Sequence, residues 1–303
     1  MKKVKTEPET VSITAIVTAF RRVEQTLDTL RRLSGCRPAP GEILVHVDGG
    51  EVDCANAIRV QYPDIKILLS ADNIGPGGSR NKLIAAAHFE WVASFDDDSY
   101  PLDVDFFQRV WDLSQQLPTT AVLAAVVYHR GETVDPENRI GRWVADFSGG
   151  ACAYRRQVFL NTAGYVPLAI AYGMEEVDLA MRLHASGERI YQAGWLRVFH
   201  DTNLNRHDDP LITSASISNL ALLAFLRYPL SCWWIGVVQV AKRVIWLKNY
   251  GRYRGILRGL IEIPARLYRL RTHRELLSPS AIKSYLMLRR SCGESSLVKF
   301  ERP

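Results

Sequence analysis

The chain is poor in cysteine, and this restricts its class. Its 303 residues include five cysteines, which share no CxxC or Cys/His metal-binding spacing. A disulfide framework is therefore not expected, and the scatter favours reduced thiols in a cytosolic protein. Repeats and low-complexity segments are missing as well, which argues against solenoid and fibrous classes. The five cysteines are Cys36, Cys54, Cys152, Cys232 and Cys292.

Long hydrophobic runs are also missing, and an export signal is not expected. The longest uncharged run near the C-terminus, Tyr228–Ala241, has 14 residues, fewer than the roughly 20 that span a bilayer. Near the N-terminus, Glu7 and Glu9 separate the lysines from a short apolar run, which favours a first strand over a signal peptide. Neither GxGxxG nor a P-loop is present, which disfavours nicotinamide and NTPase functions.

Charge is distributed unevenly along the chain. The net charge is +6, but residues 242–290 hold thirteen Lys and Arg against two Glu, a local charge of +11. Because the last thirteen residues are neutral overall, residues 1–241 carry −5. A mildly acidic body with a basic tail predicts that the tail has a role of its own.

The first half of the chain alternates β-rich and helical runs, which is typical of a parallel sheet with right-handed crossovers. Each predicted strand ends in a polar or glycine-rich segment, where ligands bind in such sheets. About Ala121–Asp201, mixed strands and helices are expected. The predicted strands are Ile13–Phe20, Glu42–Val47, Ile65–Leu69 and Glu90–Phe95, and the predicted helices are Val23–Leu33, Ala55–Gln61 and Arg80–His88.

Three consecutive carboxylates, Asp96, Asp97 and Asp98, follow the apolar strand Glu90–Phe95. Neighbouring carboxylates repel one another unless a cation or solvent compensates them. Oxygen ligands of this kind suit Mg²⁺ or Mn²⁺, which bridge to a diphosphate. A solvated acidic loop or a helix cap is the alternative interpretation.

A second acidic group, Glu175, Glu176 and Asp178, lies in the first turn of a predicted helix. Acidic residues at this position interact favourably with the helix dipole, so capping is one explanation. The functional interpretation is that one carboxylate removes a proton from a hydroxyl. Glu176 and Asp178 point in different directions, and only one of them is expected to be the base.

Two weaker signals complete the pattern. The segment Asp72–Asn81 places glycines before Arg80, and such a loop brings backbone amides and a guanidinium to an anion; a plain turn is the alternative. His200 follows a predicted strand. It is either a structural histidine or a third metal ligand.

Taken in order, these features resemble glycosyltransferase family 2, whose inverting enzymes have the GT-A fold and use nucleotide-diphosphate sugars. The similarity covers roughly residues 12–205. The segments that carry it are Ile16–Arg21 as the opening strand and turn, Val45–Gly50 as the VDDGS motif, Asn73–Asn81 as the NxGxxxARN segment, Asp96–Asp98 as the DXD motif, Ser148–Arg156 as the acceptor-side segment, Glu175–Leu179 as the ED-type motif, and His200.

The resemblance implies a role for each candidate residue. Thr18, Asp48, Asn73 and Arg80, with Asp96 or Asp97, would bind the nucleotide. Asp98, with Asp96 and His200, would hold the divalent cation, Mg²⁺ or Mn²⁺. Glu176 would be the catalytic base, with Glu175 and Asp178 as alternates. The sequence departs from the family pattern at Glu176, where the family usually has Asp, and at Val47 and Gly50.

These expectations define a fold and a domain division. The fold class is α/β, with a Rossmann-like, mostly parallel GT-A sheet flanked by helices and a helical basic C-terminal extension. Residues 1–215 are predicted to be the catalytic domain. Residues 216–303 are predicted to be a helical region that associates with membranes.

The expected function is inverting sugar transfer to an acceptor hydroxyl in polysaccharide or glycolipid assembly, with rhamnosyl, galactosyl and glucosyl transfer all open. The basic, Trp-containing tail suits an anionic membrane surface, which fits a glycan or lipid-linked acceptor and a cytoplasmic protein peripheral to the inner face of the plasma membrane. A helical layer with a solvated basic face is the alternative for the tail. Nucleic acid is not an expected partner, because the acidic body would repel phosphates. A sugar nucleotidyltransferase and a non-catalytic membrane-surface binding protein are the alternative functions.

Overall fold

The computed structural model describes residues 10–201 and 209–296. The chain forms two compact units. Unit 1, the sheet unit, comprises residues up to 143, 147–164 and 189–202; unit 2, the helical unit, comprises residues 144–146, 165–188 and 203 onward. The expected division between residues 215 and 216 differs from these units in two ways. It falls inside the helix Pro210–Arg227, and it separates Glu175–Ala185 from the later helices, with which this segment groups.

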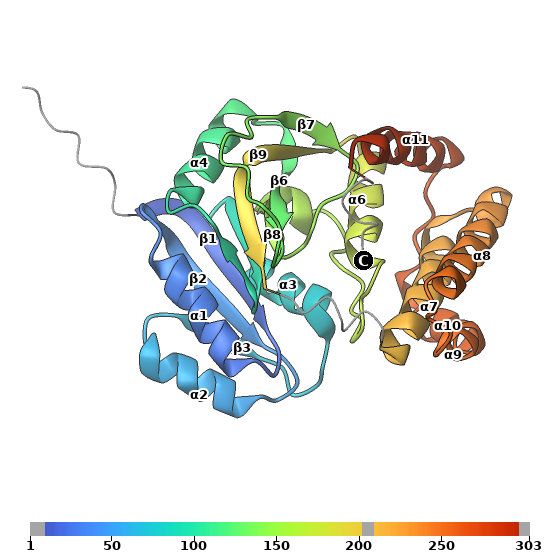
Figure 1. Ribbon diagram of the computed structural model, residues 1–303, viewed down its shortest axis with the longest axis horizontal. Helices are drawn as coiled ribbons and strands as arrows, with labels where there is room; N and C mark the ends of the chain where they lie inside the picture. Colours follow the sequence, from blue (N-terminus) through green and yellow to red (C-terminus); the bar gives the residue numbers. More distant parts are fainter. Residues whose placement is uncertain (1–9, 202–208, 297–303) are drawn as a thin grey trace, which may run out of the picture. The chain divides into compact units, whose positions relative to one another are not determined.

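Within the described residues, nine strands form one sheet in the order β3-β2-β1-β4-β8-β6-β9-β5, with β7 paired to β9 (Figure 1). The four strands β3, β2, β1 and β4 are parallel, as predicted. Strand β8 is antiparallel to both β4 and β6, and β5 is antiparallel to β9. The strands are β1 Thr10–Ala19, β2 Ala39–Val47, β3 Lys66–Leu69, β4 Trp91–Asp96, β5 Ser99–Pro101, β6 Thr120–Tyr128, β7 Gly141–Val144, β8 Ala151–Arg155 and β9 Arg189–His200.

Helices α1 and α4 of unit 1 each bury one face against this sheet. In α1, the buried Thr26, Thr29, Leu30 and Leu33 recur at helical spacing. The core lies between these helix faces and the strands, where β1 and β4 contribute fully buried side chains such as Val17 and Phe95. The helices are α1 Val23–Ser34, α2 Val52–Gln61, α3 Gly75–Ala86, α4 Phe106–Gln116 and α5 Arg156–Leu160.

Helix α3 corrects one prediction. Its expected start was Arg80, after a glycine-rich loop, but it begins at Gly75, so these glycines form its first turns. The reason is a cap from another element: the Asp48 carboxylate, just after β2, accepts hydrogen bonds from the backbone N–H groups of Ile74 (3.1 Å) and Gly75 (2.9 Å). Pro76, at the helix start, has no backbone N–H and therefore leaves no donor without an acceptor there.

Unit 2 is built from helices. Helix α7 lies at its centre and contacts α8, α9 and α10, and Ile217, Leu247 and Ile256 form a small buried cluster. By length and composition alone, α7 and the segment Leu230–Asn249 are apolar enough to cross a membrane, and they are 67% and 17% buried. Helix α7 is thus the core helix of the unit. The helices are α6 Glu175–Ala185, α7 Pro210–Arg227, α8 Trp233–Asn249, α9 Ile256–Ile261, α10 Ile263–Arg269 and α11 Pro279–Ser296.

Candidate active site

The predicted nucleotide residues of unit 1 meet beyond the carboxyl ends of β1 and β4. From β1 the chain continues to β2 and β3 on one side, and β4 lies on the other. The strand order therefore reverses between β1 and β4, and open α/β sheets bind ligands at such a point. Thr18 and Asp96 are register partners at the ends of these two strands. The sheet topology thus places the acidic triplet in the expected ligand crevice.

Asp96 lies at the centre of this group and keeps 26% of its side chain exposed. Its Oδ1 accepts hydrogen bonds from the Thr18 hydroxyl (3.1 Å) and from the Arg80 guanidinium. Arg80 comes from α3, is 1% exposed, and also donates to the Ser94 hydroxyl (3.2 Å). Three predicted nucleotide residues, Thr18, Arg80 and Asp96, are therefore in direct contact, and one carboxylate among them faces solvent.

Gly150 closes one side of the Asp96 carboxylate. A Cβ built on Gly150 would overlap Asp96 Oδ2, so a larger residue there would displace this carboxylate. The Ser99 hydroxyl links the backbones of Asp96 and Gly150, because it accepts from the Asp96 N–H and donates to the Gly150 carbonyl, both at 2.7 Å. Gly150, from the predicted acceptor-side segment, therefore lies against one of the predicted nucleotide residues.

Asp97 turns toward the protein. Its Oδ2 accepts from the Phe20 N–H (3.1 Å) and its Oδ1 from Arg22 (2.9 Å), and only 6% of the residue is exposed. Burial raises the pKa of Asp97 to about 7; Arg22 opposes this, and the charges of Asp98 and Asp96 add to it. The contacts show Asp97 holding the turn between β1 and α1, and its predicted nucleotide contact stays a prediction.

Asp98 and His200 form the pair expected to hold a cation. Strand β5 pairs with β9 so that Ser99 lies opposite His200, and His200 Nε2 is 3.1 Å from Asp98 Oδ1. Arg22 donates to the other carboxylate oxygen. Burial opposes ionisation of Asp98, but His200 and Arg22 outweigh it and lower its pKa. Burial likewise disfavours charged His200, but Asp98 and Asp96 outweigh it and raise its pKa.

The donor set at Asp98 and His200 fits a divalent cation that shares its coordination with a ligand. No group of three or more His, Cys, Asp or Glu able to hold a metal occurs among residues 10–201 and 209–296. Asp96, which is also expected to hold the cation, accepts from Thr18 and Arg80 through Oδ1, and its part in metal binding stays a prediction. Two protein ligands leave several positions of a six-coordinate ion for phosphate oxygens and water. The carboxylate and the remaining oxygen ligands suit Mg²⁺ or Mn²⁺.

Asp48 and Asn73 lie at the start of α3. Asp48 is 3% exposed, and both of its oxygens accept the backbone N–H bonds that cap the helix. Asn73 is exposed, and its Oδ1 accepts from the Gly75 N–H (3.0 Å). The positive φ angles of Gly49 and Gly50 turn the chain away from β2 at this point. Both residues shape the helix terminus, and direct contact with a nucleotide stays a prediction.

The second acidic group lies in unit 2, at the start of α6, and its three carboxylates differ in exposure. Asp178 is 1% exposed; it accepts from Arg182 (2.9 Å) of α6 and from Arg227 of α7. Glu175 is 3% exposed, whereas Glu176 is partly exposed. A carboxylate enclosed by two guanidinium groups cannot reach an acceptor hydroxyl, so Asp178 has a structural role and Glu176 is the better candidate for the base.

Sequence reasoning missed two arginines that decide these arrangements. Arg22 bridges Asp97 and Asp98 and keeps 29% of its side chain exposed. Arg22 follows β1, which pairs in parallel with β4. A basic residue at this position could therefore have been predicted to contact the acidic triplet. Arg227 contacts Asp178 from 49 positions away along the chain, and no local pattern indicates that.

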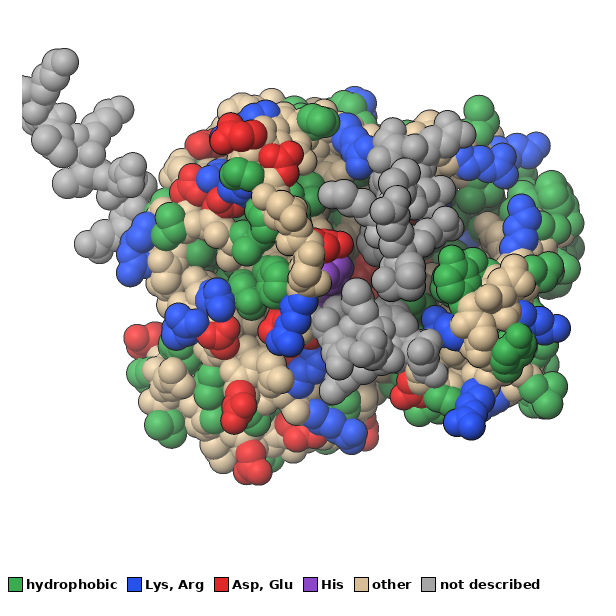
Figure 2. Space-filling view, viewed as in Figure 1, with side chains coloured by type: hydrophobic (Ala, Val, Ile, Leu, Met, Phe, Trp, Pro, Cys, Tyr) green, Lys and Arg blue, Asp and Glu red, His purple; other side chains and the backbone are tan. Residues whose placement is uncertain are grey.

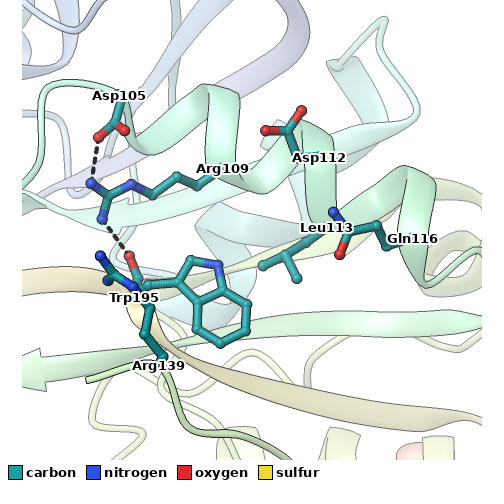
Figure 3. A pocket seen from close by; sticks show the side chains of 7 residues that line it. All are labelled: Asp105, Arg109, Asp112, Leu113, Gln116, Arg139 and Trp195. Carbon is teal, nitrogen blue, oxygen red and sulfur yellow. Dashed lines mark hydrogen bonds and ion pairs between the residues drawn. The ribbon is translucent and has the colours of Figure 1, made fainter. Parts of the chain in front are cut away.

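A separate hollow of about 470 Å³ lies beside α4 and takes no part in this site (Figure 3). Figure 3 shows Arg109 between Asp105 (2.8 Å) and the Trp195 carbonyl (2.7 Å), so its guanidinium is already paired. The hollow shares no lining residue with the acidic triplet. It is lined by Asp105, Arg109, Asp112, Leu113, Gln116, Arg139 and Trp195.

The family follows from a sequence match over the segment that contains most of the predicted nucleotide residues. Residues 14–162, from within β1 to just after α5, match the family model described as Glycosyl transferase family 2. This part of the chain belongs to glycosyl transferase family 2. The matched segment contains Thr18, Asp48, Arg80 and the acidic triplet. No curated protein matches the sequence.

Solved structures of glycosyltransferases share the fold. A mannosyltransferase from Pyrobaculum calidifontis, PcManGT, in complex with GDP-Man and Mn²⁺, is 14% identical with a TM-score of 0.55; the match covers 96% of this chain and 81% of that one. GalNAc-T7 with UDP, GalNAc and Mn²⁺ is 13% identical with a TM-score of 0.57, over 72% of this chain and 48% of that one. The present chain thus spans about half of GalNAc-T7. The expected GT-A fold is confirmed.

Proposed function

We propose that the protein transfers a sugar from a nucleotide-diphosphate donor to an acceptor hydroxyl with inversion at the anomeric carbon. The observation that carries this proposal is the cluster at the strand-order reversal, where Asp96 contacts Thr18 and Arg80 and where Asp98 lies beside His200. Family 2 membership over residues 14–162 supports the reaction class. GalNAc-T7 and PcManGT, of the same fold, were solved with UDP and GDP-Man, each with Mn²⁺.

Each residue has a proposed task. Thr18, Asp48, Asn73, Arg80 and Asp96 bind the nucleotide, with Arg80 buried and fixed so that its guanidinium holds the Asp96 carboxylate in one orientation. Asp98 and His200 hold Mn²⁺ or Mg²⁺. When bound, the cation supplies charge that stabilises the departing diphosphate. Arg22 adds a fixed positive charge next to Asp98.

The proposed base is Glu176. Its carboxylate accepts the proton of the acceptor hydroxyl while the acceptor oxygen bonds to the anomeric carbon and the bond to the diphosphate oxygen breaks. Partial exposure at the start of α6 favours Glu176 over the buried Glu175 and the arginine-bound Asp178. A single displacement of this kind inverts the anomeric configuration.

A thermal-shift screen tests the donor site. UDP-, dTDP- and GDP-sugars are added to the protein with Mn²⁺, with Mg²⁺ or with EDTA. A donor at 100 times its Kd is expected to stabilise the fold by about 2.7 kcal/mol, and only when the metal is present. If divalent ions change the affinity for none of these nucleotides, the proposal fails. Stabilisation by nucleoside triphosphates with sugar phosphates would indicate a nucleotidyltransferase instead.

Glu176→Gln tests the base. The glutamine keeps the size of the side chain but cannot accept the proton, so turnover is expected to fall by about 10²–10⁴-fold while the donor still binds. Initial rates of sugar transfer and the thermal shift with donor are measured together. The matched control is Glu188→Gln, another partly exposed glutamate of unit 2. Full turnover in Glu176→Gln would remove Glu176 from the mechanism and leave the donor site untouched.

For the acceptor and the location, we propose a glycan or lipid-linked acceptor in polysaccharide or glycolipid assembly at the cytoplasmic face of the plasma membrane. Support comes from the net charge of +11 over residues 242–290, because anionic lipids attract such segments. Fractionation of cells that express the full chain tests this location. Recovery only in the soluble fraction, at low salt, would refute it.

A further inference from the structure

Helix α8 exposes its apolar face. Trp234 (64% exposed), Val237 (69%), Val238 (42%) and Ile245 (58%) recur with Ala241 at intervals of three and four residues along the helix. Residues at this spacing lie on one side of a helix. We call these five residues, Trp234, Val237, Val238, Ala241 and Ile245, the α8 stripe.

The opposite side of α8 is fixed against unit 2. Leu247 is fully buried in a cluster with Ile217 of α7 and Ile256 of α9. A Cβ built on Gly236 would overlap the Cβ of Ala224 in α7, so the two helices approach closely. Helix α8 therefore cannot rotate to bury the stripe. A helix on the surface of a soluble domain normally turns its polar side outward, and α8 does the reverse.

The charges on α8 indicate what covers the stripe. Lys242 and Lys248 are exposed, and Trp233–Asn249 contains no Asp or Glu. Figure 2 shows hydrophobic and basic side chains interleaved over the part of the surface that α8 forms. A second copy would bring the same lysines together, whereas an anionic lipid surface attracts them. Trp233 and Trp234 are of the residue type enriched at the membrane–water interface.

We propose that the α8 stripe lies in the boundary between headgroups and acyl chains of an anionic membrane, with Lys242 and Lys248 at the headgroups. One side of α8 stays on α7, so the helix lies along the interface and does not span the bilayer. The inference rests on the proposed peripheral membrane contact, but it is independent of sugar transfer. Donor binding can therefore succeed or fail without deciding it.

Vesicle flotation of the full chain tests the inference. Phosphatidylcholine vesicles with and without phosphatidylglycerol are compared, with no donor added. The wild-type chain is expected to float with the anionic vesicles only. Val237→Glu/Ile245→Glu is expected to lower partitioning by at least about tenfold, because two apolar groups are replaced by charges. Lys242→Glu/Lys248→Glu is expected to lower it to a similar extent.

Matched controls separate this surface from general effects of charge. Val60→Glu/Ile140→Glu changes two exposed apolar residues of unit 1, 86% and 72% exposed, and Arg59→Glu/Lys66→Glu changes two exposed basic residues of that unit. Both are expected to float like wild type. Circular dichroism and thermal melting without donor confirm that each variant is folded.

Brominated lipids test the depth of insertion. Their bromine atoms quench tryptophan fluorescence within the acyl region, and Trp234→Phe is expected to remove part of the quenching. The inference is overturned if the wild-type chain does not float with anionic vesicles, or if the stripe variant floats as well as wild type. It is also overturned if the chain is a dimer that Val237→Glu/Ile245→Glu disperses without any change in flotation.

Discussion

The two acidic clusters of the protein have opposite relations to solvent. In unit 1, Asp98 is compensated by Arg22 and His200, and the side chains of these two partners are 29% and 26% exposed. In unit 2, Asp178 is compensated by Arg182 and Arg227, and none of the three side chains is more than 5% exposed. Both clusters place a carboxylate between basic side chains. Only the first leaves those groups within reach of a ligand.

The difference is the one expected between a carboxylate that binds a ligand and one that has a structural role. Charges that are fully buried must satisfy each other, because water cannot replace a missing partner. Charges at the end of a strand can exchange a protein partner for a cation or a phosphate. Acidic residues that look alike in the sequence therefore differ in their access to solvent, which depends on the basic side chains that surround them.

The largest expected effect is on the buried cluster of Asp178, Arg182 and Arg227. Arg227→Met should lower the free energy of unfolding by about 3–5 kcal/mol, because Asp178 loses a buried partner. Urea denaturation of the full chain measures this. The control, Arg32→Met, removes an exposed pair with Asp28 and should change stability by at most about 1 kcal/mol. Equal losses in the two variants would show that the Asp178 cluster is not a structural anchor.

The next largest effect is expected at the partly exposed cluster of Asp98, Arg22 and His200. Asp98→Asn should keep the fold but lower metal-dependent sugar transfer by about 10²–10³-fold, because the charge that holds the cation beside the diphosphate is removed. Rates are measured across a Mn²⁺ titration. Asp28→Asn, in an exposed ion pair of α1, is the control. An unchanged dependence on Mn²⁺ in Asp98→Asn would place the cation elsewhere.

The smallest effect distinguishes the clusters by their access to ions. Arg22→Met should lower stability by about 1–2 kcal/mol, because Asp97 and Asp98 lose a partly exposed hydrogen-bonding partner. Added Mn²⁺ should then raise the melting temperature more than it does for wild type, since the cation replaces the lost positive charge. In Arg227→Met the increment from Mn²⁺ should equal that of wild type. A larger increment there would mean that the second cluster is open.

Local patterns predicted the elements that carry the site. The runs Ile13–Phe20 and Glu90–Phe95 lie close to β1 and β4 as observed, Thr10–Ala19 and Trp91–Asp96, because a buried parallel strand is a continuous apolar run. The position of the triplet at the end of β4 follows directly. The start of α3 did not follow, because its cap comes from Asp48, 26 and 27 residues before the N–H groups it accepts from.

The sequence by itself determined the family, the four parallel strands β1 to β4 and the carboxylates at the end of β4, since these depend on residue type and on short-range periodicity. Only the tertiary structure decided which carboxylates are enclosed. Arg227 reaches Asp178 from another helix, and His200 reaches Asp98 across a strand pair 102 residues apart in sequence. The free energy of a carboxylate depends on the charges around it in space, and that arrangement exists only in the folded chain.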